Sequence, residues 1–351
     1  MASHRSHALM QEDVLHYVFE HASHPHVLAQ SAAVCRTWTI PAQAALYREL
    51  EYSPLACRPR EALLARTLRT RSHLLRFIRR LCLVTIWTHS PIADLCDWIK
   101  HIPADHLRNF CWRWERGHPP PSIIESPAIR GTHHITLQGR LYSLSSIQPV
   151  LELPYLQCLS LELKGDEKGY LSVTTRPTKL RTLHLVAHEG YSPAMNTLLS
   201  AVGPQLETLH LTSRLGDDPE RDAFLVSCVA AHCAGLTRVE IKAIAMPKAP
   251  IPIADELVQH CRSLEHLHAA PGTFTPGLFR VIPSTLRVLR LPIIPEHDDE
   301  GLLLEFLEDA RRSRDGLATL ELVVGPGDKE RWERVEDACH MRGIAFRLCD
   351  D

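Results

Sequence analysis

The chain has 351 residues and is 45% hydrophobic, so it can bury a substantial core, and we expect it to be folded nearly throughout. Its 39 basic and 41 acidic residues give a net charge of −2, which excludes the strong basic excess of proteins that bind nucleic acid through charge alone. The 11 cysteines include no CxxC pair, and this favours reduced thiols over a disulfide framework or a zinc ribbon.

Three short helices are the first predicted elements, within residues 9–52 and after a disordered start at residues 1–8. Pro25 separates the first two helices, and Pro41 can sit in the first turn of the third, where its missing N–H costs nothing. So small a module should leave apolar surface for a partner helix to bury; alternatively, the same side chains pack against the first repeat. The apolar residues at helical spacing are Val14, Leu15, Val18 and Phe19, then Val27, Leu28, Ala32 and Val34, then Trp38, Ala42, Ala45 and Leu46.

Residues 53–83 predict a helical connector that leads into a first repeat. The segment holds a basic run that only Glu61 opposes: Arg58, Arg60, Arg66, Arg69, Arg71, Arg76, Arg79 and Arg80. Such a run can meet nucleic acid or an acidic partner. Because Phe77 is the one aromatic residue interleaved with these arginines, we interpret the run as the solvated face of two helices instead.

A repeated pattern, L-x-x-L-x-L, covers the rest of the chain. Measured between first positions from Leu107 onward, successive copies are 25, 24, 24, 26, 30, 28, 22 and 31 residues apart. This spacing is close to the roughly 20–29 residues of a leucine-rich repeat. The copies begin at Leu107, Thr132, Leu156, Leu180, Leu206, Leu236, Leu264, Leu286 and Leu317, and Ile78 begins a possible earlier one.

Amphipathic stretches at helical spacing separate these motifs, as around residues 194–202, 224–229 and 303–310. Each repeat is therefore a short strand followed by a helix, and only neighbouring repeats complete its core. We predict an α/β fold over residues 84–351: a leucine-rich-repeat solenoid with a curved parallel sheet, whose last helix, at about residues 329–341, precedes a closing strand at residues 344–348. An ordinary open α/β sheet is the alternative.

The residue between the last two leucines of each copy should project from the concave face of the sheet. We consider this face the candidate binding surface for a protein substrate. A metal site at His184, His210 and Glu240 is geometrically conceivable, and polarity without a binding role is the other alternative. The candidate substrate-binding residues are Ser160, His184, His210, Glu240, His268, Arg290 and Glu321.

Four motifs carry a family resemblance: E-D-V-L from Glu12, V-F from Val18, V-C-R-T-W from Val34 and A-L-Y-R-E-L from Ala45. With them, residues 9–50 resemble the F-box, and residues 64–83 look like the segment that joins F-box-like motifs to degenerate leucine-rich repeats in many fungal proteins. The resemblance implies that the module docks on the Skp-type adaptor of a cullin-based (SCF) ubiquitin ligase, while the repeats bind the protein to be ubiquitinated. The adaptor-binding residues it implies are Leu9, Val14, Leu15, Leu28, Val34, Cys35 and Trp38.

The sequence departs from the family at Met10, where the F-box motif usually has a proline. The alternative function is therefore an interaction scaffold that is not coupled to ubiquitination, in which the helices only cap the repeats. No GxGxxG, Walker, GxSxG or HExxH motif occurs, so we expect no catalysis, no metal and no cofactor. Because no apolar stretch approaches the length of a spanning helix, we expect no membrane association and a location in the cytoplasm, the nucleus or both.

Overall fold

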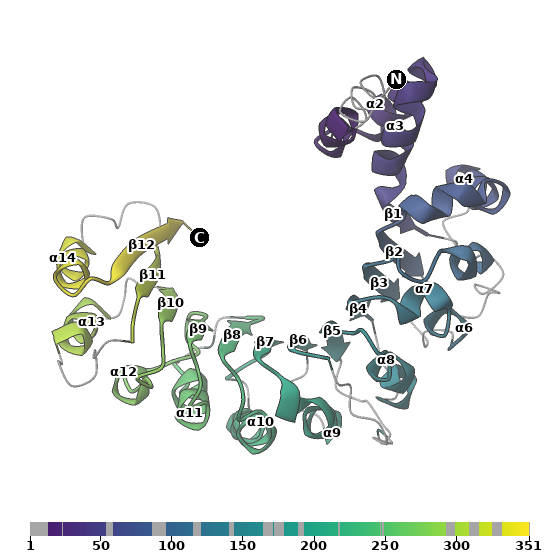
Figure 1. Ribbon diagram of the computed structural model, residues 1–351. Helices are drawn as coiled ribbons and strands as arrows, with labels where there is room; N and C mark the ends of the chain where they lie inside the picture. The colour runs from purple at the N-terminus through teal and green to yellow at the C-terminus, as the bar shows by residue number, and fades with distance from the viewer. Residues whose placement is uncertain are drawn as a thin grey trace. The chain divides into compact units, whose positions relative to one another are not determined.

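The computed structural model is built on one all-parallel sheet, whose twelve strands are neighbours in chain order from β1 to β12 (Figure 1). The structure describes residues 13–22, 24–53, 59–85, 96–114, 121–139, 144–163, 171, 179–188, 193–216, 218–245, 247, 249–292, 299–308, 316–324 and 332–350. The chain divides into two compact units, Met1–Arg140 with Pro149–Leu156, and Leu141–Gln148 with Gln157–Asp351.

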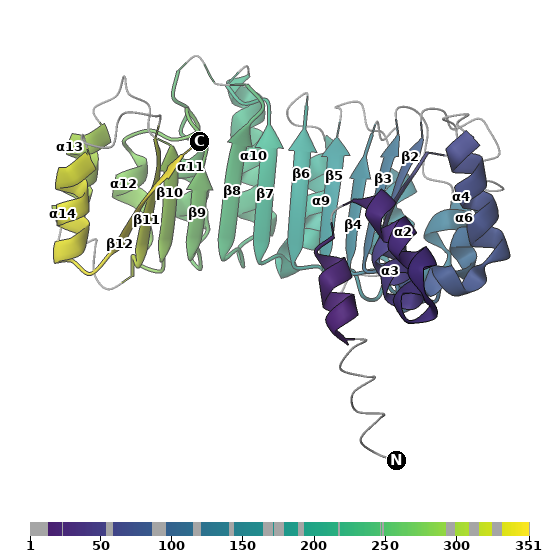
Figure 2. The same ribbon diagram turned by 90° about the horizontal axis from the view of Figure 1, so that it is seen from above.

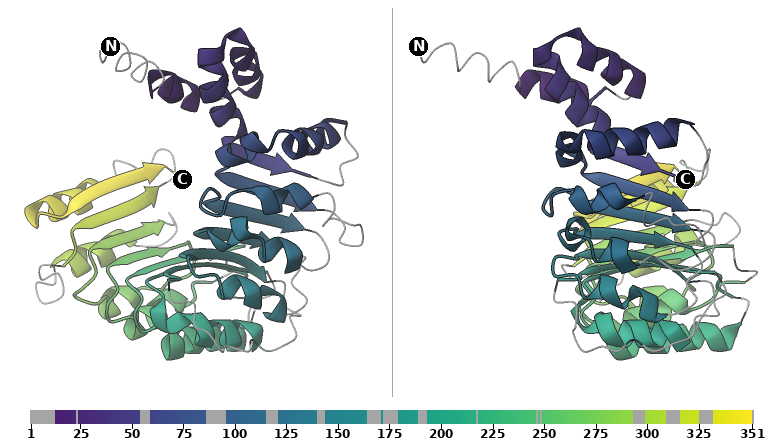
Figure 3. Two further views of the ribbon diagram at one scale, coloured as in Figure 1. Left: turned by 45° about the vertical axis from the view of Figure 1, so that its right-hand side comes forward. Right: turned by 90° about the vertical axis from the view of Figure 1, so that its right-hand side faces the viewer.

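The first unit contains the N-terminal helices and the first four strands (Figure 3). Residues 13–20 are helical, and α2 (Pro25–Val34) and α3 (Arg36–Arg48) follow, so the predicted three-helix module is present. The helical connector is also present, as α4 (Pro59–Thr70) and η1 (Ser72–Phe77). The strands are β1 (Glu49–Tyr52), β2 (Arg80–Thr85), β3 (Asn109–Trp114) and β4 (His134–Gln138), and the short helices between them are η2 (Asp97–His101), α6 (Pro121–Ile124) and α7 (Pro127–Arg130).

Two sequence predictions for the module were wrong. The chain forms β1 directly after α3, although no strand motif is visible there, because its backbone pairs in parallel with β2 from Glu49↔Arg80 to Tyr52↔Leu83. Pro41 lies in the interior of α3 and not in its first turn, because the helix already begins at Arg36. A proline there leaves one backbone carbonyl of α3 without its helical N–H partner.

Large aromatic side chains replace leucines in the core of the first unit. Trp112 takes a leucine position in β3 and is fully buried. Its indole Nε1–H donates to the Thr85 hydroxyl at 3.0 Å, which satisfies a buried donor that a leucine would not bring. The weak copy of the repeat at Thr132 is explained in a similar way: the Thr132 hydroxyl is buried and donates to the Ala128 carbonyl at 3.2 Å.

In the second unit, strands and helices alternate, and the helices lie on one face of the strands (Figure 2). We call the opposite face, on which no described helix lies, the helix-free face. The strands are β5 (Cys158–Leu163), β6 (Thr182–Ala187), β7 (Thr208–Ser213), β8 (Arg238–Ala243), β9 (His266–Ala269), β10 (Val288–Pro292), β11 (Thr319–Val324) and β12 (Ala345–Asp350). The helices are η3 (Leu144–Ile147), α9 (Pro193–Val202), η4 (Gly203–Gln205), α10 (Pro219–His232), α11 (Ile253–His260), α12 (Leu278–Val281), α13 (Asp299–Glu308) and α14 (Glu333–Met341). The short helix α8 (Gln148–Leu151) belongs almost entirely to the first unit.

Strict alternation of burial explains why the repeat leucines form strands. In β5, β6 and β7 every second residue is buried, and in β6 these residues are Leu183, Leu185 and Ala187. Side chains that alternate along a strand point to opposite faces, so the leucines face the helices and the residues between them face away. The last predicted strand is confirmed as β12, which pairs with β11.

Candidate functional site

The predicted substrate-binding residues of the second unit lie side by side on the helix-free face. Parallel pairing places each of them opposite the next, from Ser160↔His184 through Glu240↔His268 to Arg290↔Glu321. The pairing therefore brings all seven positions into one line across seven strands, which we call the helix-free row. Its members are Ser160, His184, His210, Glu240, His268, Arg290 and Glu321.

Two imidazoles stack near the start of the helix-free row. The ring centroids of His184 and His210 are 4.0 Å apart, and the ring planes differ by only 2°. Adjacent parallel strands place equivalent side chains at about the strand spacing of 4.8 Å, so the stack follows from the register of β6 and β7.

Glu240 is the electrostatic centre of the row. Its Oε2 lies 2.5 Å from Nδ1 of His210, and its Oε1 lies 2.7 Å from Nζ of Lys242 and 3.2 Å from Nδ1 of His268. Burial by itself raises the pKa of this carboxyl, but the hydrogen bond from Lys242 and the charges of Lys242, His210 and His268 outweigh burial and hold the pKa at about 2. Glu240 is therefore ionised at neutral pH.

Basic groups surround His268 as well. Burial lowers the pKa of His268, and the Arg290 guanidinium and the Lys242 ammonium lower it further, while Glu240 acts in the opposite direction. Farther along the row, Nη1 of Arg347 lies 3.3 Å from Oε1 of Glu321. Nε of Arg290 is buried and has no hydrogen-bond partner among the described residues. The row thus combines ion pairs with one buried donor that has no partner among the described residues.

The arrangement gives no support to a metal site. The His184 and His210 rings lie parallel, whereas imidazoles that share one metal ion must converge on it. Within the described ranges, no group of three or more histidine, cysteine, aspartate or glutamate side chains is placed to hold a metal ion. The same residues instead form a line of polar and charged side chains on the helix-free face.

The residues that the F-box resemblance assigns to adaptor binding are split between the surface and the interior of the module. Val14 and Val34 are 60% and 63% exposed, Trp38 is 37% exposed, and Cys35 is also exposed. Leu28 is buried in the module's own core with Phe19 and Ala42, and Leu15 packs partly against that core, so these two leucines organise the module from inside. Leu9 lies outside the described residues.

Further apolar side chains are exposed on the same module. Tyr17, Val18, Val27 and Ile40 are each at least two-fifths exposed. Of these, Val18 and Val27 stood among the predicted helix faces, whereas Tyr17 and Ile40 were missed because neither falls on a predicted apolar face. Trp38 contacts the core through an edge-to-face contact with Phe19, and the two ring centroids are 5.6 Å apart. The module therefore combines a small core with an exposed apolar surface.

Comparisons with known proteins add no family to these observations. No protein-family model matches the chain, and a search of curated proteins finds no similar sequence. In the part of the chain that the structure describes, no helix has both the length and the apolar character needed to cross a membrane. The case for a function therefore rests on the residues and their arrangement.

Proposed function

We propose that this chain is the substrate-recognition subunit of a cullin-type (SCF) ubiquitin ligase. In this proposal the N-terminal helices dock on the Skp-type adaptor, the repeats form a leucine-rich-repeat solenoid, and the helix-free face binds the protein to be ubiquitinated. The chain itself performs no catalysis. The observation that carries the proposal is the set of exposed apolar side chains on the helical module, which includes Val14, Val34 and Trp38 of the positions that the F-box resemblance assigns to the adaptor.

The solenoid part of the proposal is supported by the regular order of the elements. All twelve strands are parallel and neighbours in chain order, and the buried positions recur with the predicted repeat. A single strand–helix unit cannot cover its own apolar face, but stacking against similar units buries that face. The remaining face is then free to bind a partner over several repeats.

The adaptor part of the proposal is supported by the cost of leaving apolar side chains in water. Fully burying a valine side chain is worth roughly 1.5–3 kcal/mol, so exposed valines such as Val14, Val27 and Val34 favour association with another apolar surface. Few core residues hold the module together, and several of its large apolar side chains are exposed. A partner helix laid against the module would bury them.

Binding of the full-length chain to a purified Skp-type adaptor tests the proposal. We expect binding at micromolar concentrations in isothermal titration calorimetry, and we expect the double variant Val14→Asp/Val34→Asp to weaken it by at least tenfold while its circular dichroism stays unchanged. Met341→Asp is the matched control, because Met341 is 83% exposed on α14, outside the module. Absence of binding, or equal loss in both variants, contradicts the adaptor assignment.

A second function, a scaffold whose helices only cap the sheet, is favoured by one observation. Strand β1 follows α3 without a linker and pairs with β2, so the module is joined directly to the end strand of the sheet. A cap needs no adaptor. If the chain fails to bind the adaptor but loses stability when the module's core is disrupted by Phe19→Ala, the cap explains the module better than the ligase does.

A further inference from the structure

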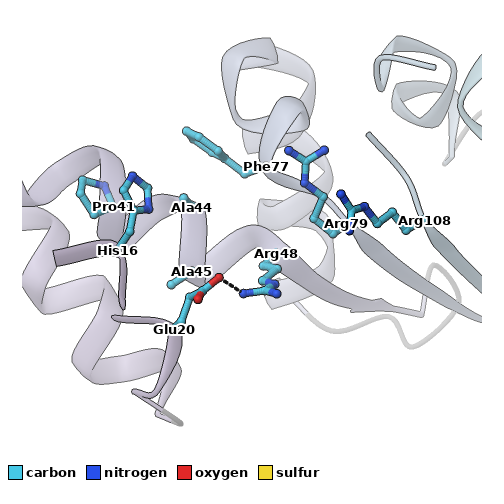
Figure 4. Close-up of a pocket in the computed structure, with 9 residues that line it drawn as sticks. All are labelled: His16, Glu20, Pro41, Ala44, Ala45, Arg48, Phe77, Arg79 and Arg108. Atoms are coloured by element: carbon cyan, nitrogen blue, oxygen red, sulfur yellow. Dashed lines mark hydrogen bonds and ion pairs between the residues drawn. The ribbon is translucent and has the colours of Figure 1, made fainter. Parts of the chain in front are cut away.

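A cavity of about 390 Å³ opens within the first unit, where the N-terminal helices meet the start of the sheet (Figure 4). His16 and Glu20 line it from the first helix, and Phe77 lines it from η1. Three arginines, Arg48, Arg79 and Arg108, also line it, and we call them the arginine row. The volume is within the range of about 300–1,000 Å³ that is typical of small-ligand sites.

The arginine row is a product of the repeat. Each arginine occupies the same place in its own unit, directly ahead of the first residue of β1, β2 or β3. The backbone links them in order: the Arg79 N–H donates to the Arg48 carbonyl at 2.8 Å, and the Arg108 N–H donates to the Arg79 carbonyl at 2.9 Å. The backbone positions of the three arginines are therefore neighbours, about one strand spacing apart.

Acidic groups do not balance this charge. Among the described residues, Glu20 is the only carboxylate that lines the cavity, and it pairs with Arg48. Nη1 of Arg79 donates to the His106 carbonyl at 3.2 Å, and no ion pair joins Arg79 or Arg108 to a carboxylate among the described residues. Burial lowers the pKa of Arg79, and the positive charges of Arg108 and Arg48 lower it further. The cavity therefore holds repelling cations that an anion would stabilise.

The equivalent position in the second unit has its arginine paired with a carboxylate on the next strand. Arg181 occupies the equivalent position ahead of β6, and the Glu207 N–H donates to its carbonyl at 2.9 Å, as in the arginine row. Here the next position is acidic, and Nε of Arg181 lies 3.0 Å from Oε1 of Glu207. A carboxylate on the next strand is therefore structurally possible, yet the first unit has arginine at three positions in succession.

We propose that this cavity binds a phosphate-type oxyanion, with the Arg79 and Arg108 guanidinium groups as its principal donors. A guanidinium group presents a planar pair of N–H donors that matches two phosphate oxygens, and it stays charged at every physiological pH. Figure 4 shows the Arg79 and Arg108 side chains next to one another, while Arg48 turns to Glu20. This site does not depend on adaptor binding, and its phosphoryl group can come from a free phosphate compound or from a phosphorylated side chain.

Titration calorimetry of the full-length chain with pyrophosphate at low salt tests the site. We expect saturable binding that Arg79→Gln and Arg108→Gln each weaken by about tenfold, the usual loss when a charged hydrogen bond is removed. Arg80→Gln removes the same charge one residue away, from a side chain that pairs with Glu49 and does not line the cavity, so it should change affinity less than about twofold. Glu20→Gln should strengthen binding, because it removes a carboxylate that competes for Arg48.

Two further measurements identify the source of the phosphoryl group and check that the variants remain folded. A phosphoserine peptide and its unphosphorylated twin are titrated beside pyrophosphate; binding of the phosphopeptide alone assigns the site to a phosphorylated protein, and binding of pyrophosphate alone assigns it to a free phosphate compound. Arg108 is exposed, so Arg108→Gln should keep the melting temperature of the wild type. No saturable binding of either probe, or equal weakening by Arg80→Gln, overturns the proposal.

Discussion

A half-buried carboxylate stays ionised only where positive groups compensate for lost hydration, and Glu240 shows how the helix-free face achieves this. Its side chain is 15% exposed, and three basic side chains on β7, β8 and β9 reach its two oxygens. The identity of each residue was visible in the sequence. The compensation arises only because parallel register places His210 and His268 on either side of Glu240.

We expect Glu240→Gln to destabilise the protein at neutral pH by about 2 kcal/mol, the order of magnitude for a pKa held well below its ordinary value of 4.5. Because the folded-state pKa is lowered, the stabilisation is present above the unfolded value and is lost as the pH falls from 4.5 towards 2. Urea denaturation at several pH values should therefore show the gap between wild type and Glu240→Gln narrowing below pH 4.5.

Glu207→Gln is the control for this prediction. Glu207 also pairs with a basic side chain, Arg181, but both groups are about half exposed, and such surface pairs contribute at most about 1 kcal/mol. We expect little change in stability from this substitution at any pH. A gap between wild type and Glu240→Gln that does not depend on pH would show that packing, and not charge, accounts for the effect.

At the scale of single elements, the strands were the most predictable part of the chain. The last two apolar positions of each L-x-x-L-x-L motif alternate as a strand with one buried face requires, and β2 to β11 form where this pattern lies. Strand β1 was not predictable, because its residues bury only Tyr52 and its pairing depends on β2, which lies in a later part of the chain beyond α4 and η1. Strand β1 therefore depends on its pairing with β2 and not on a sequence pattern of its own.

The cavity and its arginine row lay beyond sequence analysis for a related reason. All eight arginines of the basic run look alike in the sequence, and the described ones are exposed except for Arg79, which is half buried. What distinguishes Arg79 is its backbone link to Arg48 and Arg108, which come from the preceding and the following unit of the stack. Sequence spacing therefore predicted the fold of each unit but not which side chains the stack brings together.

Helix α14 offers a test of how an element ends. Gly343 follows the helix with φ = 70°, and an added Cβ would meet no atom within 4 Å, so only backbone strain opposes a side chain there. We expect Gly343→Ala to lower stability by about 1 kcal/mol, the cost of a non-glycine residue in the left-handed region. Asparagine tolerates this region better, so Gly343→Asn should cost less in thermal denaturation.

Gly316→Ala provides the contrast. Its φ is not in the left-handed region, but an added Cβ would lie 2.2 Å from the Ser284 carbonyl oxygen, which is backbone and cannot turn aside. We expect a larger loss of stability than for Gly343→Ala, because the backbone of two neighbouring segments must separate. An equal or smaller loss would mean that these segments are loosely packed in solution.

At the scale of the whole molecule, each strand pairs only with its neighbours in the chain, so the effect of a core substitution should stay local. Leu209 of β7 is 1% exposed, and Leu209→Ala should cost about 2–5 kcal/mol through lost contacts and a cavity. We expect amide hydrogen exchange to accelerate in β6, β7 and β8, while β2 and β3 of the first unit keep their protection. Leu83→Ala, in β2, should give the reverse pattern. Exchange should become faster in β1, β2 and β3 and stay unchanged in β7. Uniform acceleration across all strands in either variant would show that the two units unfold as one cooperative body, and the stack could then no longer be treated as a chain of nearest-neighbour contacts.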